Sequence, residues 1–201
     1  MTASQANGQG HDRYANLRVS AFLDALAAKG PAPAGGSAAA LVLAQAAALC
    51  AKSARLSERQ LSAGRAAELT EDAEQVRASA ASLIDEDPRA YAEVLKARRR
   101  RADQPAGSAD AAAELTAALS AAADVPLRIV ELAVPVCAIA ATLAANGNPG
   151  LRGDALAAGL LAQAAAHAAA GLVRINLASA PGDPRLARAD GLLASIDDNL
   201  K

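Results

Sequence analysis

The apolar residues of this chain are mostly alanine, and they gather in long segments such as 37–51 and 155–173. Hydrophobic residues make up 53% of the 201 residues, whereas aromatic residues make up 1% and tryptophan is absent. Alanine is the best helix former, and sheets instead favour β-branched and aromatic side chains. No run alternates between apolar and polar residues for long enough to predict a strand. We therefore expect an all-α protein with an alanine-rich core.

Apolar residues recur at helical spacing and predict an orthogonal or antiparallel bundle of about five to seven helices. Pro88 interrupts the clearest stripe, and because proline lacks an N–H we expect the helix to break or bend there. Residues 1–13 are polar and predict a disordered tail, which leaves 14–201 as a single helical domain. The expected helices cover roughly 17–29, 37–56, 61–83 with a resumption at 91–95, 109–123, 126–145, 154–177 and 186–196.

Charge, cysteine content and the apolar runs exclude several classes of protein. The formal net charge of −1 argues against a nucleic-acid binder, which needs a basic surface. Cys50 and Cys137 lie in apolar helical segments, which indicates two reduced, buried thiols. The longest apolar stretch, 155–173, contains Gln163 and His167 and is mostly Ala and Gly, so we expect a buried helix and not a membrane span. With no signal peptide at the start, the expected location is cytoplasmic.

A glycine-containing turn precedes the second expected helix. Pro33 fixes its own φ, whereas Gly35 and Gly36 can adopt backbone angles that a side chain forbids. Ser37 is then placed to cap the helix that it opens. One interpretation is an open helix N-terminus suited to an anionic or polar ligand, and the other is a turn with no further role.

Three acidic residues, Asp85, Glu86 and Asp87, follow one another just before Pro88. Neighbouring carboxylates and burial raise a pKa toward values useful for acid–base chemistry. The structural alternative is that Asp87 caps a helix that restarts with Pro88 in its first turn. The spacing alone leaves both interpretations open.

The remaining polar features carry less information. His167 is the sole histidine outside the tail, and without a second histidine or acid at helical spacing the sequence predicts no metal site. The basic run Arg98–Arg101 is typical of a solvated helix face, although it could also attract a phosphate or a polyanionic substrate tail. Asn148 and Asp154 flank a turn at a helix start, and turn and capping chemistry explains both.

Taken in order, these features resemble the cyclodeaminase/cyclohydrolase family. Its members include the C-terminal domain of formiminotransferase-cyclodeaminase and stand-alone bacterial methenyltetrahydrofolate cyclohydrolases. Five motifs appear in the family's order between about Val19 and Ile196. They are Phe22-Leu23 with Pro33-Ala34-Gly35-Gly36-Ser37, Asp85-Glu86-Asp87-Pro88-Arg89-Ala90-Tyr91, Val125-Pro126-Leu127, Gly147-Asn148 with Gly153-Asp154, and Ile175-Asn176-Leu177 with Asp183.

The resemblance implies a helical bundle that forms a homodimer, with a folate-binding cleft near the subunit contact. It places the catalytic aspartate at Asp87. A tetrahydrofolate derivative is the implied partner, and no metal or cofactor is implied beyond tetrahydrofolate as carrier of the one-carbon unit. The residues implied to bind substrate are Pro33, Gly35, Gly36, Ser37, Asn148, Asp154 and Asn176.

Two reactions and one non-enzymatic role follow from this resemblance. The first is formimidoyltetrahydrofolate cyclodeamination, in which a carboxylic acid protonates departing ammonia. The alternative reaction is hydrolysis of 5,10-methenyltetrahydrofolate, in which a carboxylate activates water. The third hypothesis is an inactive helical module for binding or interaction. It is motivated by Pro88, where the family usually has alanine, and by Gly171, where it often has asparagine. Ala34 also replaces the first glycine of the family's turn.

Overall fold

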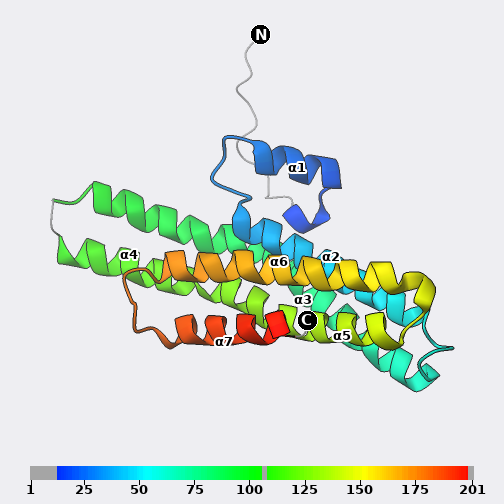
Figure 1. Ribbon diagram of the computed structural model, residues 1–201. Coiled ribbons are helices and arrows are strands. Elements are labelled where there is room, and N and C mark those ends of the chain that lie inside the picture. The colour runs from blue at the N-terminus through cyan, green and yellow to red at the C-terminus, as the bar shows by residue number, and fades with distance from the viewer. Residues whose placement is uncertain (1–12, 106–107, 199–201) are drawn as a thin grey trace, which may run out of the picture.

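The computed structural model describes residues 13–105 and 108–198, so most of the predicted tail at 1–13 lies outside the described residues (Figure 1). Arg13 is described and precedes a short 3-10 helix, η1. The described residues form helices and turns with no strand, which confirms the all-α fold. The elements are η1 Tyr14–Asn16, α1 Val19–Ala27, α2 Gly35–Arg55, α3 Ala63–Ala102, α4 Ala109–Ala122, α5 Asp124–Asn146, η2 Pro149–Leu151, α6 Arg152–Asn176 and α7 Pro184–Asp198.

Four long helices, α2, α3, α5 and α6, pack side by side and form the bundle. Contacts at the two ends of α2 show that it runs antiparallel to both α3 and α6. Its N-terminal end lies against the later part of α3 and the end of α6, and its C-terminal end lies against their beginnings. Helix α4 packs on α3, and α7 covers α5 and α6. Helix α1 lies outside the bundle, near the start of α2 (Figure 1).

Alanine fills most of the core, as the sequence predicts. Helix α2 contributes seven buried alanines together with Leu43 and Cys50, and α6 contributes a further seven alanines and Val173. Small side chains allow helix axes to approach closely, which preserves dense packing without aromatic residues. The sole phenylalanine, Phe22, is buried and anchors α1 to the rest of the protein.

Two helix boundaries differ from the sequence-based expectation. Helix α2 begins at Gly35 with Ala34 as its N-cap residue, so Ser37 lies inside the first turn and does not cap it. Helix α3 runs without interruption through Pro88, so the predicted break and the restart capped by Asp87 are both wrong. Helix α5 likewise continues through Pro135. The reason α3 tolerates Pro88 lies in a contact with α2, described below.

Three helical stretches are long and apolar enough to cross a membrane by length and composition, namely Gly35–Arg55, Ala109–Asn146 and Pro149–Asn176. The segment 155–173 lies within the last of these, so its length and composition do not bear out the expectation of a poor membrane span. The first and last of these stretches supply α2 and α6, which pack on each other in the bundle core.

Candidate active site

The N-terminus of α2 meets the middle of α3 at a contact between Ser37 and Asp87. The Ser37 backbone N–H donates to Asp87 Oδ2 at 3.1 Å, and the Ser37 hydroxyl lies 3.4 Å from the same oxygen. The N-cap residue of α2, Ala34, offers no side-chain acceptor. A carboxylate from another helix thus satisfies a free N–H of the first turn, where the helix dipole also favours negative charge. The anionic group expected at this helix start is a side chain of the protein itself.

Gly36 allows this close approach. A Cβ added at Gly36 would lie 2.8 Å from Asp87 Oδ2 and closer still to Oδ1, which is nearer than real Cβ atoms come. A Cβ added at Gly35 would meet only the Leu172 side chain at 3.9 Å, an ordinary contact. The two glycines therefore differ in their roles: the missing side chain of Gly36 leaves the space in which the Asp87 carboxylate packs against the backbone of α2.

The Ser37 hydroxyl explains why α3 continues through Pro88. A proline has no N–H to donate to the carbonyl four residues earlier, which leaves the Ile84 C=O without its helical partner. The Ser37 hydroxyl donates to this carbonyl at 2.9 Å, and both residues are buried. One side chain from α2 thus replaces the hydrogen bond that Pro88 removes from α3. The contact also fixes Asp87, nearly one turn further along α3, against α2.

The environment of Asp87 changes its protonation. Burial raises the pKa of this carboxyl above its usual value, while the backbone and hydroxyl hydrogen bonds from Ser37 act in the opposite direction. Burial is the largest contribution, so the protonated form persists to higher pH than in an exposed aspartate. A carboxyl group with a raised pKa, held in one position by a helix N-terminus, is suited to donate or accept a proton.

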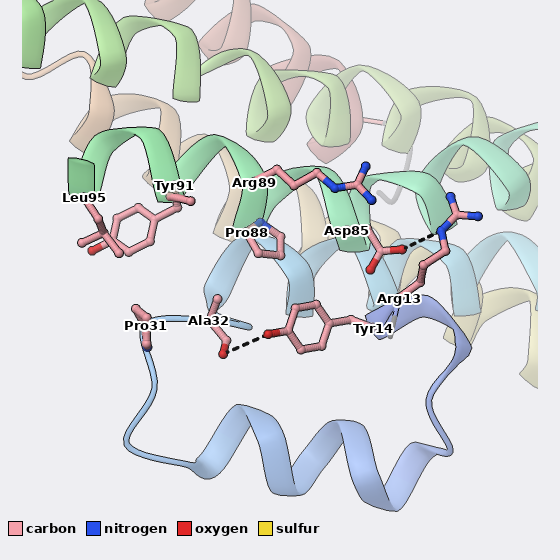
Figure 2. Close-up of a pocket in the computed structure, with 10 residues that line it drawn as sticks. Arg13, Tyr14, Pro31, Ala32, Asp85, Pro88, Arg89, Tyr91 and Leu95 are labelled. Atoms are coloured by element: carbon pink, nitrogen blue, oxygen red, sulfur yellow. Dashed lines mark hydrogen bonds and ion pairs between the residues drawn. The ribbon is translucent and has the colours of Figure 1, made fainter. Parts of the chain in front are cut away.

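A cavity of about 300 Å³ lies beside this contact, between α3 and the chain segment that leads into α2 (Figure 2). Asp85 and Pro88 line it from α3, and Tyr14 and Ala32 line it from the other side. Asp87 points instead toward the start of α2, because side chains two positions apart on a helix are separated by about 200° of rotation. The consecutive acids of the sequence therefore have distinct surroundings.

The other predicted binding residues divide between the two ends of α2. Asn176 is the last residue of α6 and donates to the Ala122 carbonyl at 3.2 Å. It lies one turn beyond Leu172, which neighbours Gly35, so Asn176 is at the end of the bundle that contains Asp87. A Cβ at Gly171, beside Leu172, would meet no atom within 4 Å. Pro33 follows Ala32 on the segment beside the cavity, after a cis peptide bond.

Asn148 and Asp154 lie at the opposite end of α2. Asn148 caps η2 through a 3.0 Å hydrogen bond from the Gly150 N–H, and its own N–H donates to Ser57 Oγ at 2.9 Å. Asp154 accepts from Lys52 Nζ at 2.7 Å. Lys52 is fifteen residues beyond Ser37, which is about 22 Å along the helix axis. Within one chain, the structure does not bring these two residues to Asp87.

The other polar features of the sequence pair with neighbours on the surface. His167 Nε2 lies 3.0 Å from Asp197 Oδ1, which joins α6 to α7. Within the basic run, Arg100 forms an ion pair of 2.6 Å with Glu114 of α4. Among the described residues, no group of three His, Cys, Asp or Glu side chains is placed to hold a metal ion.

Sequence reasoning missed three parts of this region. Nothing local to Ile84 predicts that its carbonyl needs a partner from α2, because the need arises from Pro88 four residues later. Arg13 was assigned to the tail, yet its Nε lies 3.5 Å from Asp85 Oδ2. Tyr14 and Tyr91 are the two tyrosines of the chain, and both line the cavity. The proximity of Tyr91 to the acidic residues in the sequence was the available signal.

The fold and the site define an all-α bundle protein in which a carboxylate of one helix is held at the N-terminus of another. The sequence model described as formiminotransferase-cyclodeaminase matches residues 18–189. The chain is 32% identical over 190 residues to a methenyltetrahydrofolate cyclohydrolase of Methylorubrum extorquens, covering 89% of this chain and 90% of that protein. This protein therefore belongs to the cyclodeaminase/cyclohydrolase family.

A solved structure agrees with this assignment. The crystal structure of formiminotetrahydrofolate cyclodeaminase from Thermotoga maritima superposes with a TM-score of 0.77 at 25% identity. The match covers 92% of this chain and 90% of that chain. The family expected from the five sequence motifs is thus confirmed, as is its helical fold. The roles of individual residues remain predictions.

Proposed function

We propose that this protein is a folate-dependent one-carbon enzyme that hydrolyses 5,10-methenyltetrahydrofolate, with Asp87 as its proton-transfer group. The relative from Methylorubrum extorquens, which carries this name and matches nearly the whole chain, supports the choice of reaction. The observation that carries the choice of residue is the position of Asp87, held at the start of α2 by the Ser37 N–H with a pKa raised by burial. Hydrolysis, the alternative reaction in the sequence analysis, is thus preferred to cyclodeamination.

In this mechanism Asp87 moves one proton twice. The ionised carboxylate accepts a proton from water as the water oxygen attacks the electrophilic carbon between N5 and N10. The bond from that carbon to N5 then breaks, the carboxyl returns the proton to N5, and the remaining hydroxyl proton of the adduct passes to solvent as the C=O of the formyl group on N10 forms. Among the described residues, Asp87 accepts its hydrogen bonds through Oδ2, so we assign the proton transfer to the other carboxylate oxygen, Oδ1.

Cyclodeamination of formimidoyltetrahydrofolate is the second candidate. The solved structure from Thermotoga maritima is of an enzyme with this name. The raised pKa of Asp87 also favours the protonated form, which is the form that donates a proton to ammonia as it leaves. Cyclodeamination forms 5,10-methenyltetrahydrofolate and hydrolysis consumes it, so one assay of this compound compares the two reactions.

The deciding experiment follows the loss of methenyltetrahydrofolate absorbance with purified protein, in the presence and absence of ammonium. Catalysed loss without ammonium supports hydrolysis. Additional loss that requires ammonium supports the cyclodeaminase acting in reverse. The absence of acceleration in both conditions would contradict both proposals and favour the binding module.

The variant Asp87→Asn tests the residue. Its amide oxygen can still accept the Ser37 N–H, so we expect the helical fold and the binding of folate to persist while turnover falls by at least about a hundredfold, the usual range for a positioned acid or base. Glu86→Gln is the matched control, because Glu86 is directed to Ser82 and Arg128 and away from Ser37. Full turnover in Asp87→Asn would refute the catalytic assignment.

We further propose that the enzyme is a homodimer. Asp154 is implied in the site by the family motif, yet within one chain it pairs with Lys52, which is about 22 Å along α2 from Ser37, so it can join Asp87 only from a second copy. Exposed apolar side chains on α6, Leu156 and Leu160, are available to such a contact. If the proposal is correct, mixing inactive Asp87→Asn with inactive Asp154→Asn chains restores activity, because half of the mixed dimers' sites are intact. A monomeric mass by light scattering would contradict it.

A further inference from the structure

The cavity in Figure 2 contains one deeply buried charge, the carboxylate of Asp85. Its side chain is 5% exposed. Within the described residues its Oδ2 accepts no hydrogen bond, and the neighbouring charge is Arg13 Nε at 3.5 Å. Arg13 is 63% exposed, so this guanidinium lies at the rim. Burying a carboxylate oxygen without a donor is costly, which indicates a position meant to receive N–H groups.

The rest of the cavity wall is suited to a flat ring. Tyr14 and Tyr91 present aromatic side chains, and Pro88 and Leu95 add apolar surface. The Tyr14 hydroxyl donates to the Ala32 carbonyl at 3.3 Å, which ties its ring to the segment leading into α2. Aromatic and apolar walls with a few polar groups are typical of small-molecule sites. The ligand that fits is a flat heterocycle with N–H donors along one edge.

The 2-amino-4-oxopyrimidine edge of a pterin has this chemistry. Its ring N3–H and its 2-amino group point in the same direction, so two N–H donors meet the two oxygens of one carboxylate, as in bidentate charge-assisted pairs. We propose that the cavity binds the pterin ring of the reduced folate and that Asp85 recognises this edge. The inference rests on the proposed function, since it names the part of that substrate which the cavity holds.

The size of the cavity limits which part of the substrate it holds. About 300 Å³ is at the small end of the range of about 300–1,000 Å³ for ligand sites, so it accommodates a bicyclic ring and not a whole folate with its aminobenzoyl-glutamate arm. Asp85 and Asp87 face different sides of α3. Asp85 therefore binds the 2-amino edge within the cavity, and the second ring, which carries N5, extends toward the start of α2, where Asp87 transfers the proton.

The tyrosines provide a probe confined to this cavity. The chain has two tyrosines and no tryptophan, and both tyrosines line the cavity. Protein labelled with 3-fluorotyrosine therefore gives two ¹⁹F resonances, each reporting on the proposed pterin site. We expect 5-formyltetrahydrofolate and a 6-methyltetrahydropterin fragment to shift both resonances, and p-aminobenzoylglutamate to shift neither. Resonances that move with p-aminobenzoylglutamate and not with the pterin would overturn the proposal.

Substitution of the carboxylate completes the test. Asp85→Asn replaces one acceptor oxygen with a donor, so we expect the dissociation constant of the pterin fragment to rise at least about tenfold. KM should rise as well, while kcat at saturating substrate stays near the wild-type value. Glu86→Gln removes the same charge from the adjacent residue outside the cavity and should bind as the wild type does. Unchanged affinity in folded Asp85→Asn would overturn the assignment.

The possible results separate this inference from the proposed function. If the protein turns over substrate but its ¹⁹F resonances do not shift when the pterin fragment is added, the proposed reaction is supported and the pterin site is refuted. Pterin binding without turnover in either ammonium condition would support the site and refute the reaction. If Asp85→Asn fails to fold, the fragment titration of the wild-type protein decides the question by itself.

Discussion

The hydrogen bond from the Ser37 hydroxyl to the Ile84 carbonyl should contribute more to the free energy of unfolding when residue 88 is proline than when it is alanine. In Ser37→Ala the buried Ile84 carbonyl loses the donor at 2.9 Å that replaces the N–H missing from Pro88. A buried polar group left without a partner costs about 1–3 kcal/mol in the free energy of unfolding. In the Pro88→Ala background, the backbone N–H restored at position 88 bonds to the same carbonyl, so removing the hydroxyl should cost about 1 kcal/mol or less.

A double-mutant cycle measures this coupling. Urea unfolding followed by far-UV circular dichroism gives the free energy of unfolding of the wild type, the two single variants and the double variant. We expect a coupling energy of about 1–2 kcal/mol. Ser53→Ala is the control, since Ser53 is buried on the same helix and its hydroxyl has no partner among the described residues. Equal costs of Ser37→Ala in both backgrounds would refute the explanation of how α3 passes Pro88.

Three further predictions concern packing, charge and thiols. Gly36→Ala should lower the free energy of unfolding by about 1–3 kcal/mol in urea unfolding, because its Cβ displaces Asp87, whereas Gly35→Ala should be neutral or mildly stabilising. The folded state raises the pKa of Asp87, so above about pH 3.8 the folded protein keeps a proton that the unfolded chain releases. The free energy of unfolding of the wild type, relative to that of Asp87→Asn, should therefore fall as the pH rises from 3.8 through the pKa of the folded state. A flat difference in unfolding midpoints across that window would contradict this. Burial raises the pKa of the Cys50 thiol to about 12 and that of Cys137 to about 11, so neither should react with a thiol reagent near pH 8 until the protein unfolds. Rapid labelling of native protein would show that these thiols are accessible.

The helices were predictable because the information that specifies them is local. Alanine content, the apolar stripes and the turn residues fixed most of the elements to within a few residues. Pro88 is the exception, because the local rule assumes that the carbonyl it releases stays without a partner. The partner, Ser37, is 47 residues away from Ile84 and becomes a neighbour only when α2 packs on α3. A single sequence contains no record of that pairing.

The candidate site was predictable in part for the same reason. Family motifs identified Asp87 and the turn at Gly35–Ser37, and the structure brings them into contact over fifty residues of sequence. Periodicity alone did not separate Asp85 from Asp87, although they lie in different surroundings. Nor did it reveal that Asn148 and Asp154 lie at the far end of α2, since that distance depends on how a long helix is oriented.

Pro88 also influences the charge on Asp87 through the single proton of the Ser37 hydroxyl. That proton is given to Ile84 at 2.9 Å, so the contact with Asp87 at 3.4 Å is the weaker one. In Pro88→Ala, the helix satisfies Ile84 and frees the hydroxyl to donate to Asp87. A hydrogen bond to the ionised form lowers a carboxyl pKa, so the acidic limb of the pH profile of kcat/KM should move to lower pH in Pro88→Ala. In Pro88→Ala/Ser37→Ala the shift should disappear, and a limb that moves equally in both variants would show that Pro88 acts on Asp87 by another route.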